Sequence, residues 1–336
     1  MNTTIRDVAK RANVSVATVS RVLNGSAKVS DTAKEAVLQA QRELGFHLNA
    51  NAKTLAQKDS NTIGILVSDI SDPYFGTMIK ACDESAHEMG KMLLITQGFY
   101  DEERELSAID SLLSHRCCAI LIHALAISDK KLMAYMQAYP YMVLINRRLA
   151  GFEDRCVMID NISAMYDLTN YVIKFGHRRI AFINSSFDIA DAKERYAGFQ
   201  KACEDNGVTI NPKLIISVPP SLEGGKTAAE KLYNIGIENF SIVMCYCDTI
   251  AASAMSIFAS HGINIPQKLS ITGFDDLFIA SCLNPTLTTV TNPIALMGQE
   301  ALKLSLERYN NNQDYRISAF KPVIILRQSV VEVKNA

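Results

Sequence analysis

Polar side chains recur directly after short aliphatic runs in residues 62–336, and their types are those that bind hydroxyl groups. The candidates are Asp72, Tyr74, His123, Asp160, Asn161, Asp191, Arg195, Cys247 and Asp275. Carboxylates, amides and a guanidinium hydrogen-bond hydroxyls, and an aromatic ring stacks on a sugar ring. Each residue taken singly also fits a helix cap or an ion pair. Their repetition at the ends of the runs predicts a sugar-binding site.

The elements that must position these side chains are strands alternating with helices. The aliphatic runs lie at 63–68, 92–96, 119–124, 142–146, 156–160, 179–184, 242–246 and 269–274. Segments of helical length separate most of them, which predicts parallel sheets covered on both faces. Eight units exceed one doubly wound sheet, so we expect two lobes. Ligands of such folds bind outside the carboxyl ends of the strands, where the polar residues stand.

Enzyme motifs are absent from the sequence. SLEGGKT (221–227) resembles a phosphate-binding loop, but Pro220 occupies the position of the first glycine, and no clear strand leads straight into it. We predict a helix start there. Gly176-His177-Arg178-Arg179 predicts a helix end with basic residues facing the helix dipole. No G-x-S-x-G, H-E-x-x-H or G-x-G-x-x-G occurs. We therefore expect a protein that is not an enzyme and has no cofactor and no metal.

The first 45 residues predict three short helices. Thr4 and Asp7 are spaced like a capping box, and the first helix runs to about Arg11. Ser15 caps a second helix whose core stripe is Val19, Val22 and Leu23. Ser30 caps the third helix, which ends at Gly45. Two helices joined by a short turn and supported by a third form a helix-turn-helix. A small structural three-helix module is the alternative.

The outer face of the second helix carries small residues and one arginine rather than Glu and Lys, so this helix can approach another surface closely. Arg21 suits the O6/N7 edge of guanine, and Val16 and Ala17 can meet thymine methyls in the major groove. Candidates for contacts to phosphates are Thr4, Ser15, Thr18, Ser20 and Asn24. Farther along, Asn49 is a candidate DNA contact, and Leu55 can wedge between base steps of the minor groove. A plain flexible linker is the alternative for residues 48–61.

Charge and composition agree with this division of the chain. Residues 1–60 hold nine Lys/Arg and five Asp/Glu, whereas the remaining residues hold 25 and 30. A basic head on an acidic body is typical of a nucleic-acid-binding module joined to another domain. No 18-residue apolar run and no apolar signal core appear, so we expect a cytoplasmic, nucleoid-associated protein without a membrane partner. The eight cysteines predict buried thiols rather than disulfides or zinc ligands.

Several motifs resemble those of the LacI/GalR family of bacterial transcription regulators, over essentially the whole chain. They are IRDVAKRANVSVATVSRVLN, NANAKTLA, GHRRIAFI, RYAGF and LSITGFDD followed by PTLTTV. The segments ISDPYFGTMIKA, HRCCAILIHA, MVLINRRLAGFEDRC and DIADAKERYAGF resemble the galactose-regulating branch of that family. One departure is Cys247-Asp248, where the family commonly has Asn-Asp. A thiol cannot replace the donor and acceptor pair of an amide, so the identity of the sugar stays open.

The resemblance implies an all-α helix-turn-helix headpiece plus an α/β body, with two doubly wound parallel-sheet lobes of periplasmic-binding-protein type. The implied domains are a headpiece (1–47), a hinge helix (48–61) and an effector-binding and dimerisation domain (62–336). The lobes would span roughly 62–161 with 291–321, and 162–290 with 322–336. Family recognition positions fall on Val16, Ala17, Arg21 and Leu55. Its sugar-binding positions fall on Asp72, Tyr74, His123, Asp191, Arg195 and Asp275, with Asp160 and Asn161 near the cleft.

We therefore expect a homodimeric repressor that reads a pseudo-palindromic operator and leaves it when a small sugar, D-galactose, binds. Two alternatives stay open: another effector, such as a different sugar or a purine acting as a co-repressor, and a cytoplasmic sugar-binding protein with an incidental amino-terminal module. The sequence also leaves open the operator, the regulated genes and assembly beyond a dimer.

Overall fold

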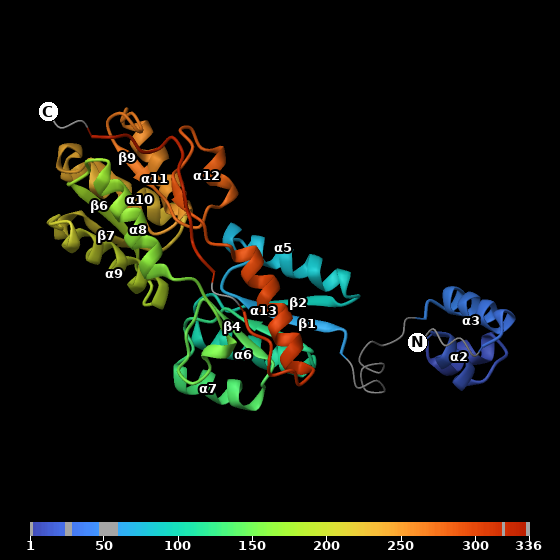
Figure 1. Ribbon diagram of the computed structural model, residues 1–336. Helices are drawn as coiled ribbons and strands as arrows, with labels where there is room; N and C mark the ends of the chain where they lie inside the picture. The colour runs from blue at the N-terminus through green and yellow to red at the C-terminus, as the bar shows by residue number, and fades with distance from the viewer. Residues whose placement is uncertain (1–2, 24–28, 47–59, 318–319, 334–336) are drawn as a thin grey trace. The chain divides into compact units, whose positions relative to one another are not determined.

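The computed structural model describes residues 3–23, 29–46, 60–317 and 320–333, and the chain divides into two compact units between Asn61 and Thr62. The smaller unit is all-helical and the larger unit is α/β (Figure 1). The expected hinge (48–61) lies almost entirely outside the described residues. The expected division at 1–47, 48–61 and 62–336 therefore stays a proposal.

Three helices form the small unit: α1 (Ile5–Arg11), α2 (Val16–Leu23) and α3 (Asp31–Leu44). Val8, Val19 and Val37 supply one fully buried side chain from each helix. The Ser30 hydroxyl accepts a hydrogen bond from the Ala33 N–H, which satisfies an amide at the start of α3. Gly45 follows α3 in the left-handed conformation, with φ of 58°. The three predicted helices are confirmed.

The first sheet of the large unit is parallel, with the strand order β2-β1-β3-β4-β5. Its strands are β1 (Thr62–Val67), β2 (Met92–Gln97), β3 (Ala119–Ile122), β4 (Met142–Ile145) and β5 (Cys156–Val157). The helices around it are α5 (Pro73–Glu88), α6 (Glu102–Ser114), α7 (Asp129–Ala138), α13 (Ile294–Tyr309) and the 3-10 turn η1 (Glu153–Arg155). Ile63 and Ile65 pack toward α5 and α13, whereas Leu66 packs toward α6. Both faces are therefore covered, as the aliphatic runs predicted.

The second sheet is also parallel, with the order β7-β6-β8-β9. Its strands are β6 (Ile180–Ser185), β7 (Ile215–Val218), β8 (Ile242–Cys245) and β9 (Ser270–Thr272). Its helices are α8 (Asn161–Lys174), α9 (Ala190–Asp205), α10 (Leu222–Ile235), α11 (Asp248–Ser260) and α12 (Phe278–Cys282), with the 3-10 turns η2 (Pro212–Leu214) and η3 (Ile237–Asn239). The two-lobed α/β fold is confirmed.

Strand β7 was missed by the sequence prediction. It lies at the edge of its sheet, and Ser217 interrupts the apolar pattern and is exposed. An edge strand buries only part of its surface, so its sequence lacks the continuous aliphatic run of a central strand. The strand also corrects the statement that none leads into SLEGGKT. The predicted helix start is nevertheless right, because the Ser221 side chain caps α10 by accepting from the Gly224 N–H.

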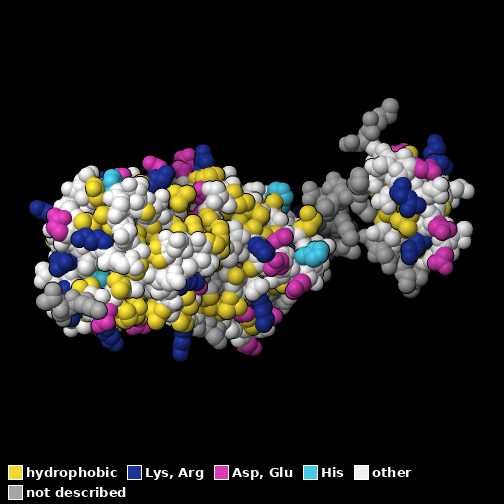
Figure 2. Space-filling model, turned by 90° about the horizontal axis from the view of Figure 1, so that it is seen from above, with side chains coloured by type: hydrophobic (Ala, Val, Ile, Leu, Met, Phe, Trp, Pro, Cys, Tyr) yellow, Lys and Arg dark blue, Asp and Glu magenta, His cyan; other side chains and the backbone are white. Residues whose placement is uncertain are grey.

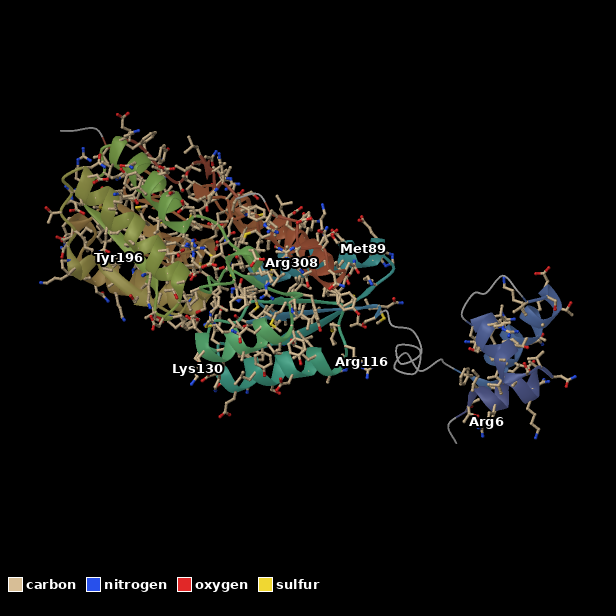
Figure 3. All side chains as sticks on the ribbon, turned by 60° about the horizontal axis from the view of Figure 1, so that its bottom comes forward. Arg6, Met89, Arg116, Lys130, Tyr196 and Arg308 are labelled. Carbon is tan, nitrogen blue, oxygen red and sulfur yellow. The ribbon has the colours of Figure 1, made fainter. Side chains whose placement is uncertain are left out.

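The chain returns to the first sheet after entering the second. Strand β10 (Thr289–Val290) pairs antiparallel with β11 (Ile324–Ile325), and α13 lies between them in sequence and packs on α5, β3 and β4. Arg308 near the end of α13 is buried and donates to Asp154 at 3.2 Å, whereas Lys130 on α7 projects outward (Figure 3). The exact lobe boundaries remain our proposal.

The GHRR segment ends α8 as predicted, with Gly176 at φ of 87° and the Arg178 guanidinium donating to the Ile173 carbonyl. His177 departs from the prediction, because it turns inward and not toward the helix end. Its Nδ1 lies 2.8 Å from the Ser241 hydroxyl and its Nε2 lies 3.1 Å from the Val331 carbonyl. Burial lowers the pKa of His177 to about 4, so its ring is neutral near pH 7.

The cysteines of the described structure are all free thiols, and only Cys282 among them is exposed. The prediction of mainly buried thiols is confirmed. The helices of the described residues include none with the length and apolar character needed to cross a bilayer.

Gly225 marks a close approach of α10 to α11. A Cβ atom there would lie 2.6 Å from the Ile250 carbonyl oxygen, which is backbone and cannot rotate away. We expect Gly225→Ala to lower the free energy of unfolding by about 1–3 kcal/mol, as overpacking does. Urea unfolding of the purified protein measures it.

Gly76→Ala on α5 is the matched control. Nothing lies within 4 Å of a Cβ atom placed at this glycine. Alanine also favours the helix over glycine by about 0.5–1 kcal/mol, so this variant should unfold at the parental urea concentration or above it. Equal midpoints for the two variants would contradict the packing explanation.

Candidate functional site

Helix α2 of the small unit presents a face of small and apolar side chains to solvent. Val16 is 42% exposed, and Ala17 and Arg21 are also exposed, while Val19 and Val22 point into the core. An exposed valine beside an alanine and an arginine gives a surface that can lie against base edges, with a guanidinium that reaches a guanine. Helix α2 therefore has the form of a recognition helix.

Some of the predicted phosphate-contacting side chains already form hydrogen bonds within the small unit. The Thr4 hydroxyl donates to Asp7 at 2.7 Å, and this hydrogen bond lowers the pKa of the Asp7 carboxyl. The Ser15 and Thr18 hydroxyls lie 2.9 Å apart, and the Ser15 oxygen also accepts from the Thr18 N–H. These hydroxyls, with that of Ser20, stay predicted DNA contacts. The predicted contacts Asn24, Asn49 and Leu55 lie outside the described residues.

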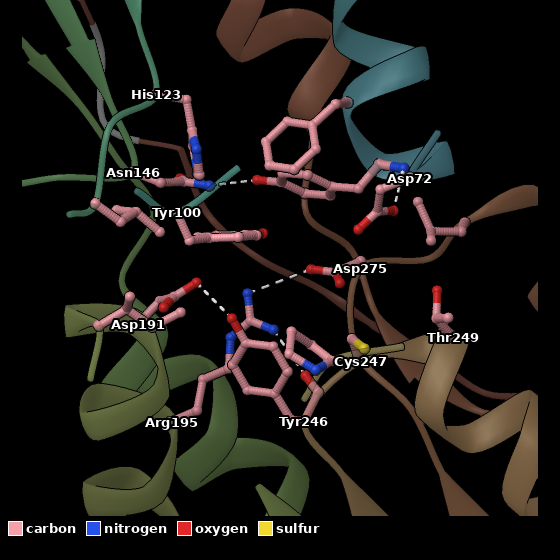
Figure 4. A pocket seen from close by; sticks show the side chains of 16 residues that line it. Asp72, Tyr100, His123, Asn146, Asp191, Arg195, Tyr246, Cys247, Thr249 and Asp275 are labelled. Atoms are coloured by element: carbon pink, nitrogen blue, oxygen red, sulfur yellow. Dashed lines mark hydrogen bonds and ion pairs between the residues drawn. The ribbon is translucent and has the colours of Figure 1, made fainter. Parts of the chain in front are cut away.

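A polar pocket in the large unit collects most of the predicted sugar-binding residues. Seven of the nine line it: Asp72, Tyr74, His123, Asp191, Arg195, Cys247 and Asp275 (Figure 4). They follow strands of both sheets, so the pocket lies where the carboxyl ends of the two sheets face each other. The hollow encloses about 490 Å³, its open mouth included.

Arg195 on α9 is the buried cation of the pocket. Its Nε donates to the Asn161 side-chain oxygen at 3.0 Å, one Nη donates to the Tyr246 carbonyl at 2.7 Å, and the other donates to Asp275 at 3.3 Å. The guanidinium carbon also lies 3.8 Å from the centre of the Phe274 ring. Burial alone would lower the pKa of Arg195, but Asp275, Tyr246, Asp191 and Tyr74 together raise it. The arginine is therefore held charged.

Asp275 is held in a strained conformation, with φ of 105°. Its carboxylate accepts from Arg195 and, at 3.0 Å, from the Asn292 amide, which also donates to the Tyr74 hydroxyl at 3.2 Å. This chain of hydrogen bonds links α9 of one lobe to α5 of the other. Burial raises the pKa of Asp275 to about 6, although Arg195 opposes the shift. The carboxylate thus becomes ionised within the physiological range.

Two further carboxylates line the pocket. Asp191 accepts from the Tyr246 hydroxyl with one oxygen, at 2.7 Å, and from the Ala192 N–H with the other, at 2.8 Å. Asp72 caps α5 by accepting from the Tyr74 N–H at 2.9 Å. Burial raises the pKa of Asp72. Because a carboxylate has about four lone-pair positions, both keep capacity for ligand hydroxyls.

His123 completes the polar lining from the first lobe. Its Nδ1 lies 3.0 Å from the Ser68 hydroxyl, and its ring meets Phe75 edge-on at 4.7 Å. Burial lowers the pKa of His123 to about 4. The imidazole is therefore neutral near pH 7 and can accept from or donate to a hydroxyl through Nε2.

Two of the predicted residues do not line the pocket. Asp160 is exposed and caps α8, where its carboxylate accepts from the Ser163 N–H and hydroxyl at 2.9 and 2.7 Å. These local bonds hold Asp160 at the helix start, outside the pocket lining. Asn161 lies behind Arg195 and orients that guanidinium.

A buried carboxylate behind the pocket was missed by the sequence prediction. Glu105 on α6 is fully buried and accepts the backbone N–H groups of Leu125, Ala126 and Ile127 at 2.9–3.1 Å. Arg147 braces the same loop by donating to the Ala124 carbonyl at 2.7 Å. The loop begins at His123 and carries Leu125 into the pocket. The overlooked signal is a glutamate at i, i+3, i+4 spacing with Ala108 and Ile109, on the apolar face of a helix.

Other pocket residues were missed because their types are common in cores and turns. They are Phe75, Tyr100, Leu125, Asn146, Ile189, Pro220, Tyr246, Thr249 and Leu277. Tyr100 comes from the turn after β2, which the strand-end pattern did not weigh. Asn146 was noted after its strand but was not selected.

The side chains of the pocket are suited to binding a ligand. Burial raises the pKa of the Cys247 thiol well above its usual range, so the sulfur is not an activated nucleophile. Asp248 is buried and already accepts from the Leu277 N–H and the Thr289 hydroxyl, each at 2.7 Å. Within the described ranges, no group of three or more His, Cys, Asp or Glu side chains is placed to hold a metal ion. The arrangement can hydrogen-bond several hydroxyls at once.

Comparisons with known proteins match both units. A family model described as bacterial regulatory proteins of the lacI family matches residues 4–49, and one described as periplasmic binding proteins and sugar binding domain of the LacI family matches residues 60–320. The chain is 42% identical to the transcriptional regulator GalR of Escherichia coli K12, over 97% of this chain and 95% of that one. It is 40% identical to GalS of Salmonella typhimurium LT2, over 99% and 98%.

Solved structures agree at the level of the fold. The Lac repressor dimer bound to operator and the anti-inducer ONPF covers 98% of this chain and 100% of its own, with a TM-score of 0.84 and 23% identity. A sugar-binding transcriptional regulator of the LacI family from Escherichia coli, complexed with phosphate, is 29% identical. The match covers 82% of this chain and 100% of the chain of that regulator, with a TM-score of 0.72.

The raised pKa of Asp275 predicts a pH dependence of ligand binding. We expect the affinity for a hydroxyl-rich ligand, measured by calorimetry, to be full above pH 7 and to fall as the pH drops through about 6. Protonation removes the charge that pairs with Arg195 and reduces the capacity to accept ligand hydroxyls. The same raised pKa means that the contribution of Asp275 to fold stability is present below about pH 4 and declines as the pH rises through 6.

The control compares the pH profile of a variant at a pocket carboxylate with that of a variant at a surface carboxylate. Asp275→Asn should bind weakly with a flat profile from pH 5 to 8, while Asp160→Asn should keep the parental profile. A parental affinity that does not change between pH 5 and 8 would contradict the assignment of Asp275.

The Glu105 brace predicts a local loss of order. In Glu105→Gln an NH2 group replaces one oxygen that accepts backbone N–H groups, so hydrogen bonds to a charged acceptor, worth about 1.5–3 kcal/mol, are lost. We expect hydrogen exchange of the Leu125, Ala126 and Ile127 amides to quicken by about tenfold or more, and the affinity for a hydroxyl-rich ligand to fall. Glu103→Gln on the exposed side of α6 is the matched control. Unchanged protection of those three amides would show that the brace is dispensable.

Proposed function

The chain belongs to the LacI family of bacterial regulatory proteins, and on that premise we propose that D-galactose is the effector that controls it. It is a sugar-responsive transcriptional repressor that binds DNA, and it is not an enzyme. The observation that carries the choice of sugar is the identity of 40–42%, over nearly the whole chain, to GalR and GalS, the galactose repressor and isorepressor.

The pocket geometry supports a neutral, hydroxylated ligand. Asp72, Asp191 and Asp275 offer acceptors for hydroxyl hydrogens, while Arg195 and the neutral His123 can donate. Tyr100 offers an aromatic face for the apolar side of a sugar ring. The residues come from both lobes, so a ligand that binds all of them favours the closed arrangement of the lobes by its differential affinity.

We place the protein on DNA as a homodimer, whose two-fold axis matches a pseudo-palindromic operator. In this mechanism Val16, Ala17 and Arg21 read bases in the major groove, and Leu55 from residues 48–61 wedges into the minor groove. Apolar side chains are spread over the visible face of the larger unit (Figure 2), which is consistent with a surface that a second copy covers. As a DNA-binding regulator it acts in the cytoplasm, and we propose that it associates with the nucleoid.

Sugar binding and DNA binding are coupled in this proposal. Closure of the lobes around the sugar shifts the ends of the large unit that carry the linkers, so the paired linkers separate and the operator is released. By thermodynamic linkage, operator DNA must then weaken sugar binding by the same factor. Couplings of this kind are typically about 1–3 kcal/mol.

Cys247 favours a second candidate effector. It stands in the pocket, only 7% exposed, where the family commonly has asparagine, and its thiol is a weak hydrogen-bonding group. A sugar other than galactose, with no hydroxyl directed at this sulfur, would fit such a position.

The test measures operator binding while a ligand panel is titrated. In fluorescence anisotropy with the operator of the galactose regulators, we expect D-galactose to weaken binding about 5–150-fold, with glucose, arabinose and purines inactive. Arg21→Ala should lose specific binding by about 1–3 kcal/mol, whereas Lys34→Ala on α3 should lose little. Release by another panel member with no effect of galactose would overturn the galactose assignment. Equal loss in both variants would overturn the role of α2.

A further inference from the structure

Two adjacent residues near the start of α9 bind the same amide group. Arg195 donates from its Nε to the side-chain oxygen of Asn161 at 3.0 Å, and Glu194 accepts from the Nδ2 of Asn161 at 3.0 Å. A guanidinium can only donate and a carboxylate can only accept, so both neighbours require the same orientation of the amide. Asn161 is buried, and α9 therefore holds its amide at both ends.

This amide lies where the chain passes from the first sheet of the large unit to the second. Asn161 is the first residue of α8, and α8 follows β5 after a short crossover segment. Within that segment, Ile159 pairs with Phe320 of the segment that follows α13. The hydrogen bonds of Asn161 therefore join the helix that carries the pocket arginine to a crossover between the sheets.

Close packing of α8 on α9 keeps Glu194 beside the amide. Glu194 and Gly198 are four residues apart and so lie on one face of α9. A Cβ atom at Gly198 would overlap the Ile162 carbonyl oxygen, so this face lies directly against the start of α8. The neighbouring cation, Lys193, pairs with Asp188 at 2.5 Å. The half-buried Glu194 carboxylate is thus directed at α8 and its Asn161 amide.

The orientation of the Arg195 guanidinium depends on its Nε hydrogen bond. The guanidinium carbon lies over the rings of Phe274 and Tyr246, 3.8 and 4.5 Å from their centres, and these rings restrict tilting of its plane. Rotation within the plane is limited by the hydrogen bonds to Asn161 and to the Tyr246 carbonyl. The bond to Asp275, at 3.3 Å, is longer than most and fixes the orientation less firmly.

A reversed amide would remove this restraint. It would turn the NH2 group of Asn161 toward the Nε–H of Arg195, and two donors cannot bond each other. The Nε–H would then be buried without an acceptor, which is unfavourable. The group that prevents the reversal is the Glu194 carboxylate, because it accepts the Nδ2 hydrogen.

We propose that Glu194 is a positioning residue of the sugar site, which acts through Asn161 on Arg195. This inference rests on the proposed sugar-binding function and deepens it, because Glu194 is not among the residues that line the pocket. Its carboxylate keeps the amide oxygen of Asn161 toward Arg195, and the guanidinium keeps the orientation in which it faces Asp275 and a ligand. A supporting hydrogen bond of this kind holds a binding group in its productive geometry.

The first measurement needs no ligand and reports on Arg195 directly. NMR of the full-length protein with isotope-labelled arginine follows the exchange of the Arg195 Nε hydrogen with water, and Arg195→Lys assigns the signal. We expect Glu194→Leu, which cannot accept a hydrogen bond, to speed this exchange about tenfold. Glu194→Gln should keep the parental rate, because its side-chain oxygen can still accept from Asn161. Glu204→Leu, at an exposed position of the same helix, is the matched control and should also keep it.

The second measurement is a double-mutant cycle with D-galactose as the calorimetric probe. We expect Glu194→Leu to weaken binding about fivefold, roughly the net value of one hydrogen bond. Asn161→Ala should weaken binding at least as much. Adding Glu194→Leu to Asn161→Ala should cause no further loss, because Glu194 acts through the amide that is already absent. A general effect of Glu194 on the helix or on surface charge would instead add to the loss in Asn161→Ala.

The outcomes separate this inference from the choice of sugar. Faster exchange in Glu194→Leu alone, with no galactose binding by the parental protein, would support the positioning of Arg195 and overturn the galactose proposal. Unchanged exchange in Glu194→Leu, or exchange that is equally fast in Glu194→Gln or in the Glu204 control, would overturn the role of Glu194. So would unchanged galactose affinity in Glu194→Leu, or additive losses in the cycle.

Discussion

The charge of a guanidinium buried between two lobes must be neutralised, and its N–H groups must find acceptors. This requirement fixes the positions of several elements of the large unit. Arg195 is 2% exposed, and each of its three nitrogens donates one hydrogen bond to a fixed acceptor: Asn161, the Tyr246 carbonyl and Asp275. Removing one partner from a buried charge is costly, on the order of 3–5 kcal/mol, so these elements are held together. Asp275 in turn holds Asn292, which bonds Tyr74 of the opposite lobe. The pocket is thus largely formed before a ligand arrives.

The same network explains why ligand binding can act at a distance. Its members lie on α5, α8, α9 and the segments after β8, β9 and β10, which belong to both lobes. A hydroxyl-rich ligand that replaces or adds hydrogen bonds there changes the relative stability of lobe arrangements, rather than the stability of one lobe. The chain enters the large unit at β1, whose carboxyl end leads to Asp72 of the pocket. The strand that receives the linker is therefore continuous with a ligand-binding loop.

The sequence predicted the features whose signals come from neighbouring residues, and it missed those that depend on residues far apart in the chain. Caps and core stripes of α1, α2 and α3 depend on neighbouring residues, and they were predicted correctly. The eight aliphatic runs all contain strands, because an aliphatic run marks a strand covered by helices; β7, whose run is broken at Ser217, was not seen. Seven of nine ligand candidates share a pocket because parallel strands end at one edge. Asp160 does not line the pocket, since a carboxylate that caps its own helix has the same sequence signature. Glu105 and Tyr100 act through contacts distant in sequence, which periodicity does not report.

The central claim is that occupation of the Arg195 pocket and occupation of DNA oppose each other in one molecule. The most direct measurement is a closed thermodynamic cycle: calorimetric Kd values for D-galactose on the protein alone and on the protein saturated with operator, set beside operator Kd values with and without saturating galactose. We expect the two ratios to be equal and at least about fivefold. A galactose affinity that is the same with and without operator, while galactose still binds the pocket, would contradict the coupling between the two sites.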